Sequence, residues 1–248
     1  MGRAKRIYNV AIFTPTSGTV KATYCNSLVG LILYYMTTPI VKDDAHETRG
    51  VTLDQIIGSV IIAARESAVE DTLKNPHATH LLFIDDDMGF KSHILNLALS
   101  RDKPIVLANY RRKSPPWSFT AIRGNMPIEL STYEDRLEPC DFGGFGFALI
   151  QRKVLEAIQA PRFLNEWRQD RHGKWVYTTE DYPFFAKARE AGFQPLVDHE
   201  ISKCVWHVGD HSHVWHEKVE QDVSENTWTQ VVERTRQIEE EEQRGGVA

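Results

Sequence analysis

Cysteine is scarce in this sequence: Cys25, Cys140 and Cys204 are spread over 248 residues. An odd number of cysteines with no short spacing gives neither a disulfide framework nor a four-cysteine zinc site. Reduced thiols are typical of cytosolic proteins, so we expect a cytoplasmic location. No apolar run reaches the ~20 residues of a membrane span, and the basic N-terminal residues lack the apolar core of a signal peptide.

An excess of positive charge is also missing, since 34 acidic residues outnumber 29 Lys and Arg and give a formal net charge of −5. This balance argues against a broad nucleic-acid-binding face but leaves room for a local basic patch. The hydrophobic fraction of 42% is ordinary for a soluble globular protein. With no internal repeat and no linker composition, we expect one domain over residues 1–222, followed by a C-terminal helix and frayed tail at 223–248.

Strand patterns and helix patterns alternate along the chain. In the second helix, Thr52 and Gln55 form a capping-box pattern at the start, and the stretches 111–139 and 160–177 read as loops. The expected strands are 7–14, 39–41, 79–84, 103–110, 144–150, 194–198 and 203–208, and the expected helices are 24–35, 52–73, 92–99, 152–158 and 179–191. This alternation predicts an α/β fold with a mostly parallel central sheet flanked by helices.

The most informative stretch is THLLFIDDDMGF, residues 79–90, in which four apolar residues precede Asp85, Asp86 and Asp87. In open α/β sheets, ligands bind beyond the carboxyl ends of the strands. Three adjacent carboxylates repel one another, and Mg²⁺ or Mn²⁺ takes oxygen ligands that it often shares with phosphate. We therefore expect a divalent-cation site that recruits a diphosphate; the alternative is a solvated acidic turn.

This stretch resembles the DxD region of GT-A-fold, family 2-like glycosyltransferases that use nucleotide sugars. The resemblance extends over residues 7–209, with gaps at 111–139 and 160–177. Further segments follow in the family's order: IFTPTSG in the first-strand loop, IIAARESAVEDTL with Glu66 in place of the usual Asn, the Gly-rich DFGGFGFALIQRKVLEAI, the Glu-Asp helix TTEDYPFFAKAREAGFQPLVD, and CVWHVG in the closing strand.

The resemblance implies a metal-dependent hexosyl- or pentosyltransferase that moves a sugar from a nucleoside-diphosphate sugar to an acceptor hydroxyl. Residues 1–108 would form the nucleotide-sugar-binding half and 109–222 the acceptor half. The implied donor-binding residues are Thr14, Pro15, Thr16, Arg65, Asp85, Asp86, Gly143 and Gly144, and the implied ligands of Mn²⁺ or Mg²⁺ are Asp87 and His207.

Glu180 and Asp181 match the acidic pair of the family's acceptor region, and Asp181 is the better match to the general base. Such a base takes the proton of the acceptor hydroxyl. The alternative is that these carboxylates only complement the dipole of the helix that they begin. The other site residues have structural alternatives as well. Arg65 could be an exposed residue of a surface helix, His207 could be a structural histidine, and Gly143 and Gly144 could form a tight turn.

The acceptor is not readable from the sequence: a glycan, a small molecule and a hydroxymethylated DNA base remain open. Arg111, Arg112 and Lys113, with Trp117 nearby, form a basic loop that holds phosphates or stacks a base or sugar, or is simply solvated. The C-terminal histidines, His207, His211, His213 and His216, with Cys204, fit no standard zinc spacing.

Two rival functions remain. One is a nucleotidyltransferase, for which the loop TPTSGTVK is a poor match, because those enzymes place a Gly-rich basic loop after their first strand. The other is a non-catalytic module that binds a nucleotide sugar or carbohydrate.

Overall fold

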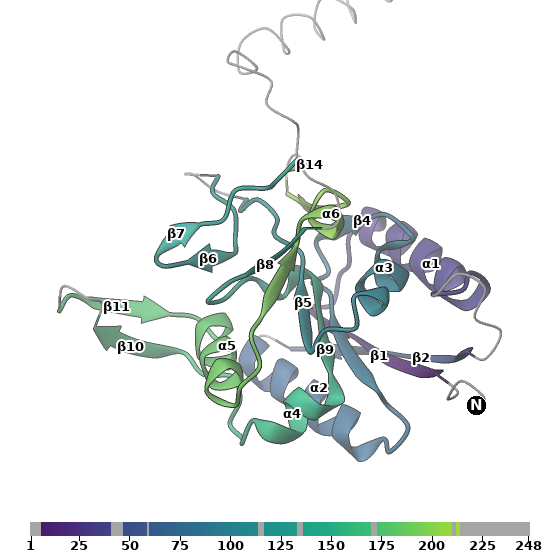
Figure 1. Ribbon diagram of the computed structural model, residues 1–248, viewed down its shortest axis with the longest axis horizontal. Helices are drawn as coiled ribbons and strands as arrows, with labels where there is room; N and C mark the ends of the chain where they lie inside the picture. The colour runs from purple at the N-terminus through teal and green to yellow at the C-terminus, as the bar shows by residue number, and fades with distance from the viewer. Residues whose placement is uncertain are drawn as a thin grey trace, which may run out of the picture. The chain divides into compact units, whose positions relative to one another are not determined.

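The computed structural model describes residues 6–40, 47–58, 60–113, 117–132, 136–169, 173–209 and 212–213 (Figure 1). Its elements are β1 (Arg6–Thr16), α1 (Ala22–Thr37), β2 (Glu47–Ile57), α2 (Ile61–Lys74), β3 (His80–Phe83), β4 (Met88–Phe90), α3 (Ile94–Ser100), β5 (Ile105–Leu107), β6 (Ile122–Arg123), β7 (Met126–Pro127), β8 (Leu137–Pro139), the 3₁₀ helix η1 (Phe145–Phe147), β9 (Ala148–Gln151), α4 (Arg152–Ala157), β10 (Glu166–Gln169), β11 (Trp175–Thr178), α5 (Asp181–Glu190), β12 (Leu196–Asp198), α6 (His199–Ser202), β13 (Val205–Val208) and β14 (Ser212–His213).

The central sheet of the described chain has seven strands in the order β2-β1-β3-β9-β5-β12-β8. Strands β2, β1 and β3 are parallel to one another, as are β5 and β12. Strand β9 runs antiparallel between β3 and β5, and β8 pairs antiparallel with β12 at the edge. The predicted mostly parallel α/β sheet is therefore confirmed.

Helices cover both faces of this sheet, so its central strands are buried on both sides. In β3, Leu81 and Phe83 pack into the cluster that includes α2, α4 and α5, whereas Leu82 and the following Ile84 pack into the cluster that includes α1 and α3. This alternation follows from the two-residue period of a strand. It explains why the sequence is apolar throughout HLLFI.

The sequence prediction was wrong for residues 52–57, which belong to β2 and not to a helix. Thr52 and Gln55 pair in register with β1 residues, and α2 begins only at Ile61. Pairing with β1 over the whole length of β2 outweighs a capping pattern, which depends on local hydrogen bonds alone. The strand expected at 39–41 is not formed at Pro39 or Ile40.

Two smaller predictions also need correction. The expected loop at 160–177 contains the antiparallel hairpin β10–β11, and helix α3 is capped at His93 without a side-chain hydrogen bond, so Ser92 is not its cap. The predicted C-terminal helix at 223–248 lies outside the described residues. None of the described helices is both long and apolar enough to span a lipid bilayer.

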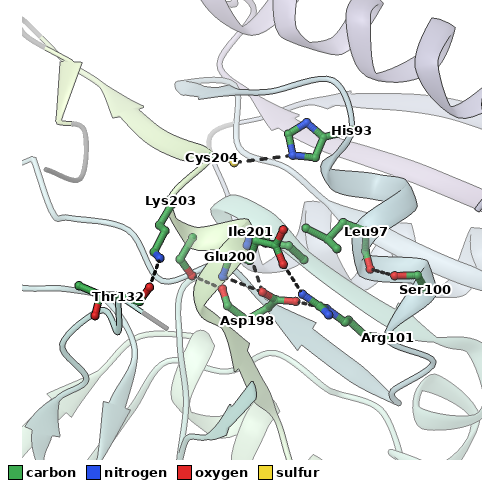
Figure 2. A network of polar contacts seen from close by, with 11 residues as sticks. His93, Leu97, Ser100, Arg101, Thr132, Asp198, Glu200, Ile201, Lys203 and Cys204 are labelled. Carbon is green, nitrogen blue, oxygen red and sulfur yellow. Dashed lines mark hydrogen bonds and ion pairs between the residues drawn. The ribbon is translucent and has the colours of Figure 1, made fainter. Parts of the chain in front are cut away.

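A network of polar contacts fixes the start of the segment that leads into β13 (Figure 2). Buried Asp198 accepts hydrogen bonds from the backbone N–H groups of Glu200 and Ile201, and its other oxygen lies 2.6 Å from Arg101 Nε. The same guanidinium contacts Glu200 at 2.8 Å. Because Arg101 follows α3 and Asp198 caps α6, this network joins the two helices and sets the direction in which the chain enters β13.

Candidate functional site

The three aspartates lie at the carboxyl end of β3, where the chain turns into β4. Strand β4 pairs antiparallel with β13, and this pairing sets Met88 opposite His207. The backbone N–H of Val208 also donates to the Asp87 carbonyl at 2.7 Å. Residues 120 positions apart in the sequence, Asp87 and His207, are thereby held side by side.

The hydrogen bond of His207 determines which of its ring nitrogens faces Asp87. Nδ1 lies 2.8 Å from the carbonyl oxygen of Arg111, and because a carbonyl only accepts, Nδ1 carries the proton. In the neutral ring, Nε2 then presents its lone pair, 3.7 Å from Asp87 Oδ1. Asp87 Oδ1 is buried and has no hydrogen-bond partner among the described residues. Two electron-rich atoms facing each other favour positive charge between them, either a metal ion or a proton on Nε2.

The other carboxylate oxygen of Asp87 contacts the ammonium group of Lys113. The basic loop thus folds back toward the aspartates. No group of three or more His, Cys, Asp or Glu among the described residues is placed to hold a metal ion. Asp87 and His207 supply only two ligands, so Mg²⁺ or Mn²⁺ would need phosphate oxygens and water to complete its coordination.

Arg65 lies at the centre of a second group of carboxylates. Its side chain is 3% exposed, and Nη2 donates to Asp85 at 3.1 Å. Nε lies 3.5 Å from Glu180, and Nη1 lies 3.9 Å from Asp181. The guanidinium packs 4.5 Å above the ring of Phe145, an arrangement that stabilises a desolvated cation. Arg65 therefore joins Asp85, after β3, to the acidic pair at the start of α5.

Hydrogen bonding around Arg65 is incomplete. Arg65 Nε, Arg65 Nη1 and Asp181 Oδ1 are buried and make no hydrogen bond to any described residue. Together with Asp87 Oδ1, they make up most of the unsatisfied buried side-chain atoms in the described chain. Buried polar groups normally have partners, so their concentration here indicates a place where a polar ligand completes the hydrogen bonding.

Burial raises the pKa of Asp181 to about 7, although Arg65 opposes the shift, and the neighbouring Glu180 and Asp85 raise it further. The pKa of Asp85 is also raised, first by burial, with Arg65 acting against it. Glu180 is buried at the N-cap position of α5 but makes no side-chain capping hydrogen bond. Its carboxylate is directed to Arg65, so simple helix capping does not account for Glu180.

The glycine-rich segment has a packing role. A Cβ on Gly144 would lie 2.2 Å from the hydroxyl oxygen of Tyr110, and one on Gly146 would lie 2.5 Å from it. A Cβ on Gly143 would meet Leu107 at 3.0 Å. The Tyr110 hydroxyl accepts a hydrogen bond from the Gly146 N–H at 2.7 Å. These glycines leave room for Tyr110, whose ring contacts the ring of His207 edge-on at 4.8 Å.

The predicted first-strand residues lie at the carboxyl end of β1. Thr14 contacts the hydroxyl of Tyr24 and lines a hollow of about 300 Å³ with Asp54 and Gln55 of β2. Pro15 is half-buried. Thr16 accepts a hydrogen bond from the Gly18 N–H at 3.1 Å. Burial raises the pKa of Asp86, and a hydrogen bond with the Thr16 side chain opposes that shift.

The basic loop is held mainly by backbone contacts. The Arg112 N–H donates to Ser118 O at 3.0 Å, and Arg111 donates to the Trp117 carbonyl at 3.1 Å. The Arg111 guanidinium lies 4.7 Å from the ring of Phe119. Arg112 and Trp117 are exposed, so they are accessible to a ligand, whereas Arg111 is committed to the loop.

Most of the predicted residues thus converge, and the structure adds three that sequence reasoning missed: Tyr110, Phe145 and Gly146. Only Gly146 left a signal, as the third glycine of FGGFGF. Of the histidine cluster, His211 and His216 lie outside the described residues, and the backbone of His213 pairs with His207. Cys204 Sγ lies 3.8 Å from His93 Nε2 (Figure 2).

No protein-family model matches this chain. Curated proteins gave no match either. Among solved structures, A197 from STIV is similar with a TM-score of 0.55 and 17% identity, over 88% of this chain and 100% of that one. GalNAc-T7, solved with UDP, GalNAc and Mn²⁺, is similar with a TM-score of 0.53 and 10% identity, over 91% of this chain. This chain spans about half of GalNAc-T7, 48% of its length. These similarities show a GT-A-like fold.

Proposed function

We propose that this protein is a metal-dependent glycosyltransferase that transfers a sugar from a nucleoside-diphosphate sugar to an acceptor hydroxyl. The observation that carries the proposal is the convergence of Asp87, His207, Arg65 and Asp181 at the carboxyl ends of the strands. This is the edge of an α/β sheet at which ligands bind. The structural similarity to GalNAc-T7, which was solved with UDP, GalNAc and Mn²⁺, supports the same class of chemistry.

Asp87 and His207 are the residues that would hold the divalent cation. Their facing oxygen and nitrogen, 3.7 Å apart, and the unpaired Asp87 Oδ1 fit an ion with few protein ligands. When bound, such a cation supplies positive charge that stabilises the departing nucleoside diphosphate. Lys113, on the other oxygen of Asp87, adds positive charge on the same side.

The donor would lie between the hollow at Thr14 and the aspartates. The hollow offers the amide of Gln55, which faces Tyr24, to the hydrogen-bonding edge of a nucleobase. Asp85 and Asp86 would bind hydroxyl groups of the ribose or the sugar. Arg65 would keep Asp85 in position through the 3.1 Å hydrogen bond.

Asp181 would accept the proton of the acceptor hydroxyl. Its side chain is 27% exposed, so an incoming hydroxyl can reach the carboxylate, and its Oδ1 has no hydrogen-bond partner among the described residues. A pKa of about 7 places this carboxylate near the range in which a general base works best at neutral pH. Glu180, whose carboxylate lies 3.5 Å from Arg65 Nε, is the second choice for this role.

The test is donor binding and donor hydrolysis with and without a divalent cation. Melting temperatures with a panel of UDP-, GDP- and CDP-sugars, each with Mn²⁺ or with EDTA, identify the donor.

Asp87→Ala should abolish the Mn²⁺-dependent stabilisation and the slow hydrolysis of that donor. A matched control is Asp71→Ala, which removes an exposed carboxylate of α2 and should behave as wild type. Equal donor binding in EDTA, or an Asp87→Ala protein with full hydrolysis, contradicts the metal role. Hydrolysis also excludes a module that only binds.

A further inference from the structure

The hairpin β10–β11 exposes large aromatic side chains that no packing accounts for. Trp167, Trp175 and Tyr177 are 65%, 60% and 51% exposed. With Gln169, which is also exposed, they form one side of the hairpin, here named the aromatic face. Clusters of exposed apolar side chains on a soluble protein commonly mark binding sites.

The pairing of the two strands creates this face. Trp167 pairs with Tyr177 and Gln169 with Trp175, so the four side chains project to the same side of the ribbon. The rings of Trp167 and Tyr177 lie 5.2 Å apart and are tilted by 56°. The arrangement gives a broad, rigid surface, because aromatic side chains have few rotatable bonds.

The other side of the hairpin is fixed to α5. The Arg168 guanidinium stacks 4.0 Å from the ring of Tyr182, and Tyr182 in turn contacts Phe142 edge-on at 5.3 Å. Strand β11 ends at Thr178, three residues before Asp181. Figure 1 shows the hairpin projecting from the body of the fold beside α5. The aromatic face therefore belongs to a segment that runs directly into the proposed base.

The composition of the face distinguishes between possible occupants. Its four side chains are neutral. Among the described residues of the hairpin, the cations are Arg168, which is directed to Tyr182 on the opposite side, and Lys174, which lies just before β11. A single-stranded nucleic acid needs cations along its phosphates in addition to stacking rings. A neutral sugar instead places its C–H groups on the electron-rich faces of aromatic rings, and its hydroxyls can hydrogen-bond with the Gln169 amide and the Tyr177 hydroxyl.

We propose that the aromatic face binds a neutral carbohydrate chain and that this chain is the acceptor, positioned so that one of its hydroxyls reaches Asp181. Only the identification of this carbohydrate as the acceptor rests on the proposed function. The binding of carbohydrate by the hairpin is argued separately, from the side chains of the aromatic face.

Binding is measured with the full-length protein on a printed array of neutral and anionic glycans, followed by calorimetry with the neutral oligosaccharide that binds best. Trp175→Ala and Tyr177→Ala should each weaken its Kd by roughly 3- to 10-fold, the usual range for loss of one aromatic contact. Trp175→Phe keeps a ring and should retain most of the affinity. Leu33→Ala removes a similarly exposed apolar side chain, 61% exposed on α1, and should change nothing.

Hydrolysis of the nucleotide sugar without acceptor separates this inference from the proposed function. The hairpin variants should hydrolyse the donor at the wild-type rate but lose transfer to the oligosaccharide. Oligosaccharide binding with neither donor hydrolysis nor transfer in the wild type refutes the acceptor role, whereas the binding of carbohydrate by the aromatic face still stands. The carbohydrate surface itself is refuted if no glycan binds, if the hairpin variants bind as well as wild type, or if they instead lose binding of single-stranded oligothymidylate.

Discussion

Asp181→Asn separates a catalytic base from a carboxylate that only belongs to the start of α5. The substitution keeps the size of the side chain and most of its hydrogen bonding but removes its basicity. General-base catalysis contributes roughly 10²- to 10⁴-fold, so transfer to the acceptor should fall by about that factor. Donor Kd should be unchanged, because the lost interaction is made only in the transition state.

The pH dependence gives an independent measure of the same residue. With a pKa of about 7, Asp181 is roughly 9% ionised at pH 6 and 91% ionised at pH 8. Wild-type transfer under subsaturating donor and acceptor should therefore rise about tenfold between these pH values. The Asn variant should show no such rise, since its remaining activity does not depend on this ionisation.

Stability supplies the third measurement, with a defined sign. Folded Asp181 keeps its proton up to about pH 7, whereas the unfolded chain loses it near pH 4. Folding therefore takes up a proton between these values, and the contribution of Asp181 to stability is lost as the pH rises through that window. Asn has no proton to lose. The melting temperature of Asp181→Asn minus that of wild type should thus become more positive from pH 5 to pH 8.

The assay is the rate of transfer, donor Kd by calorimetry, and melting temperature for wild type, Asp181→Asn and the exposed control Asp71→Asn. An Asn variant that transfers at near-wild-type rate is incompatible with the base assignment, whatever its stability. A variant with reduced transfer that still shows the tenfold rise between pH 6 and pH 8 would assign the ionisation to another group, with Glu180 as the first candidate.

Three further substitutions probe the surroundings of the site. Arg65→Met removes the cation shared by Asp85 and the acidic pair, and should cost about 3 kcal/mol in urea unfolding because it leaves buried Glu180 and the partly buried Asp85 and Asp181 without their partner; an unchanged midpoint contradicts that role. Gly144→Ala should lower stability by about 1–3 kcal/mol through its clash with Tyr110, and adding Tyr110→Phe should recover part of the loss. Lys113→Gln should weaken donor binding by calorimetry at low ionic strength and have little effect at high salt, since the contact is electrostatic; equal weakening at both salt concentrations would indicate a different role.

The resemblance led us to expect most residues of the candidate site and the pairing of Asp87 with His207, but not the other contacts among these residues. The aspartates after β3, the acidic pair at the start of α5 and His207 each belong to a local sequence motif. Arg65 was expected to bind the donor, whereas the structure shows it between Asp85 and Asp181. Gly144 was expected to approach a ligand or to form a turn, and the structure instead shows that it accommodates Tyr110. Both outcomes depend on side chains from other parts of the chain.

The sequence alone predicted the alternation of strands and helices, the burial of HLLFI and the position of the acidic run at its end. These features follow from the periods of the two backbone conformations and from hydrophobic burial, which neighbouring residues are enough to specify. The tertiary structure was needed to establish that residues 52–57 extend the sheet, and that Glu166–Gln169 and Trp175–Thr178 pair as a hairpin with an aromatic face. Each of these depends on pairing between strands distant in sequence or separated by a turn, and such pairing overrides the local preference of the residues involved.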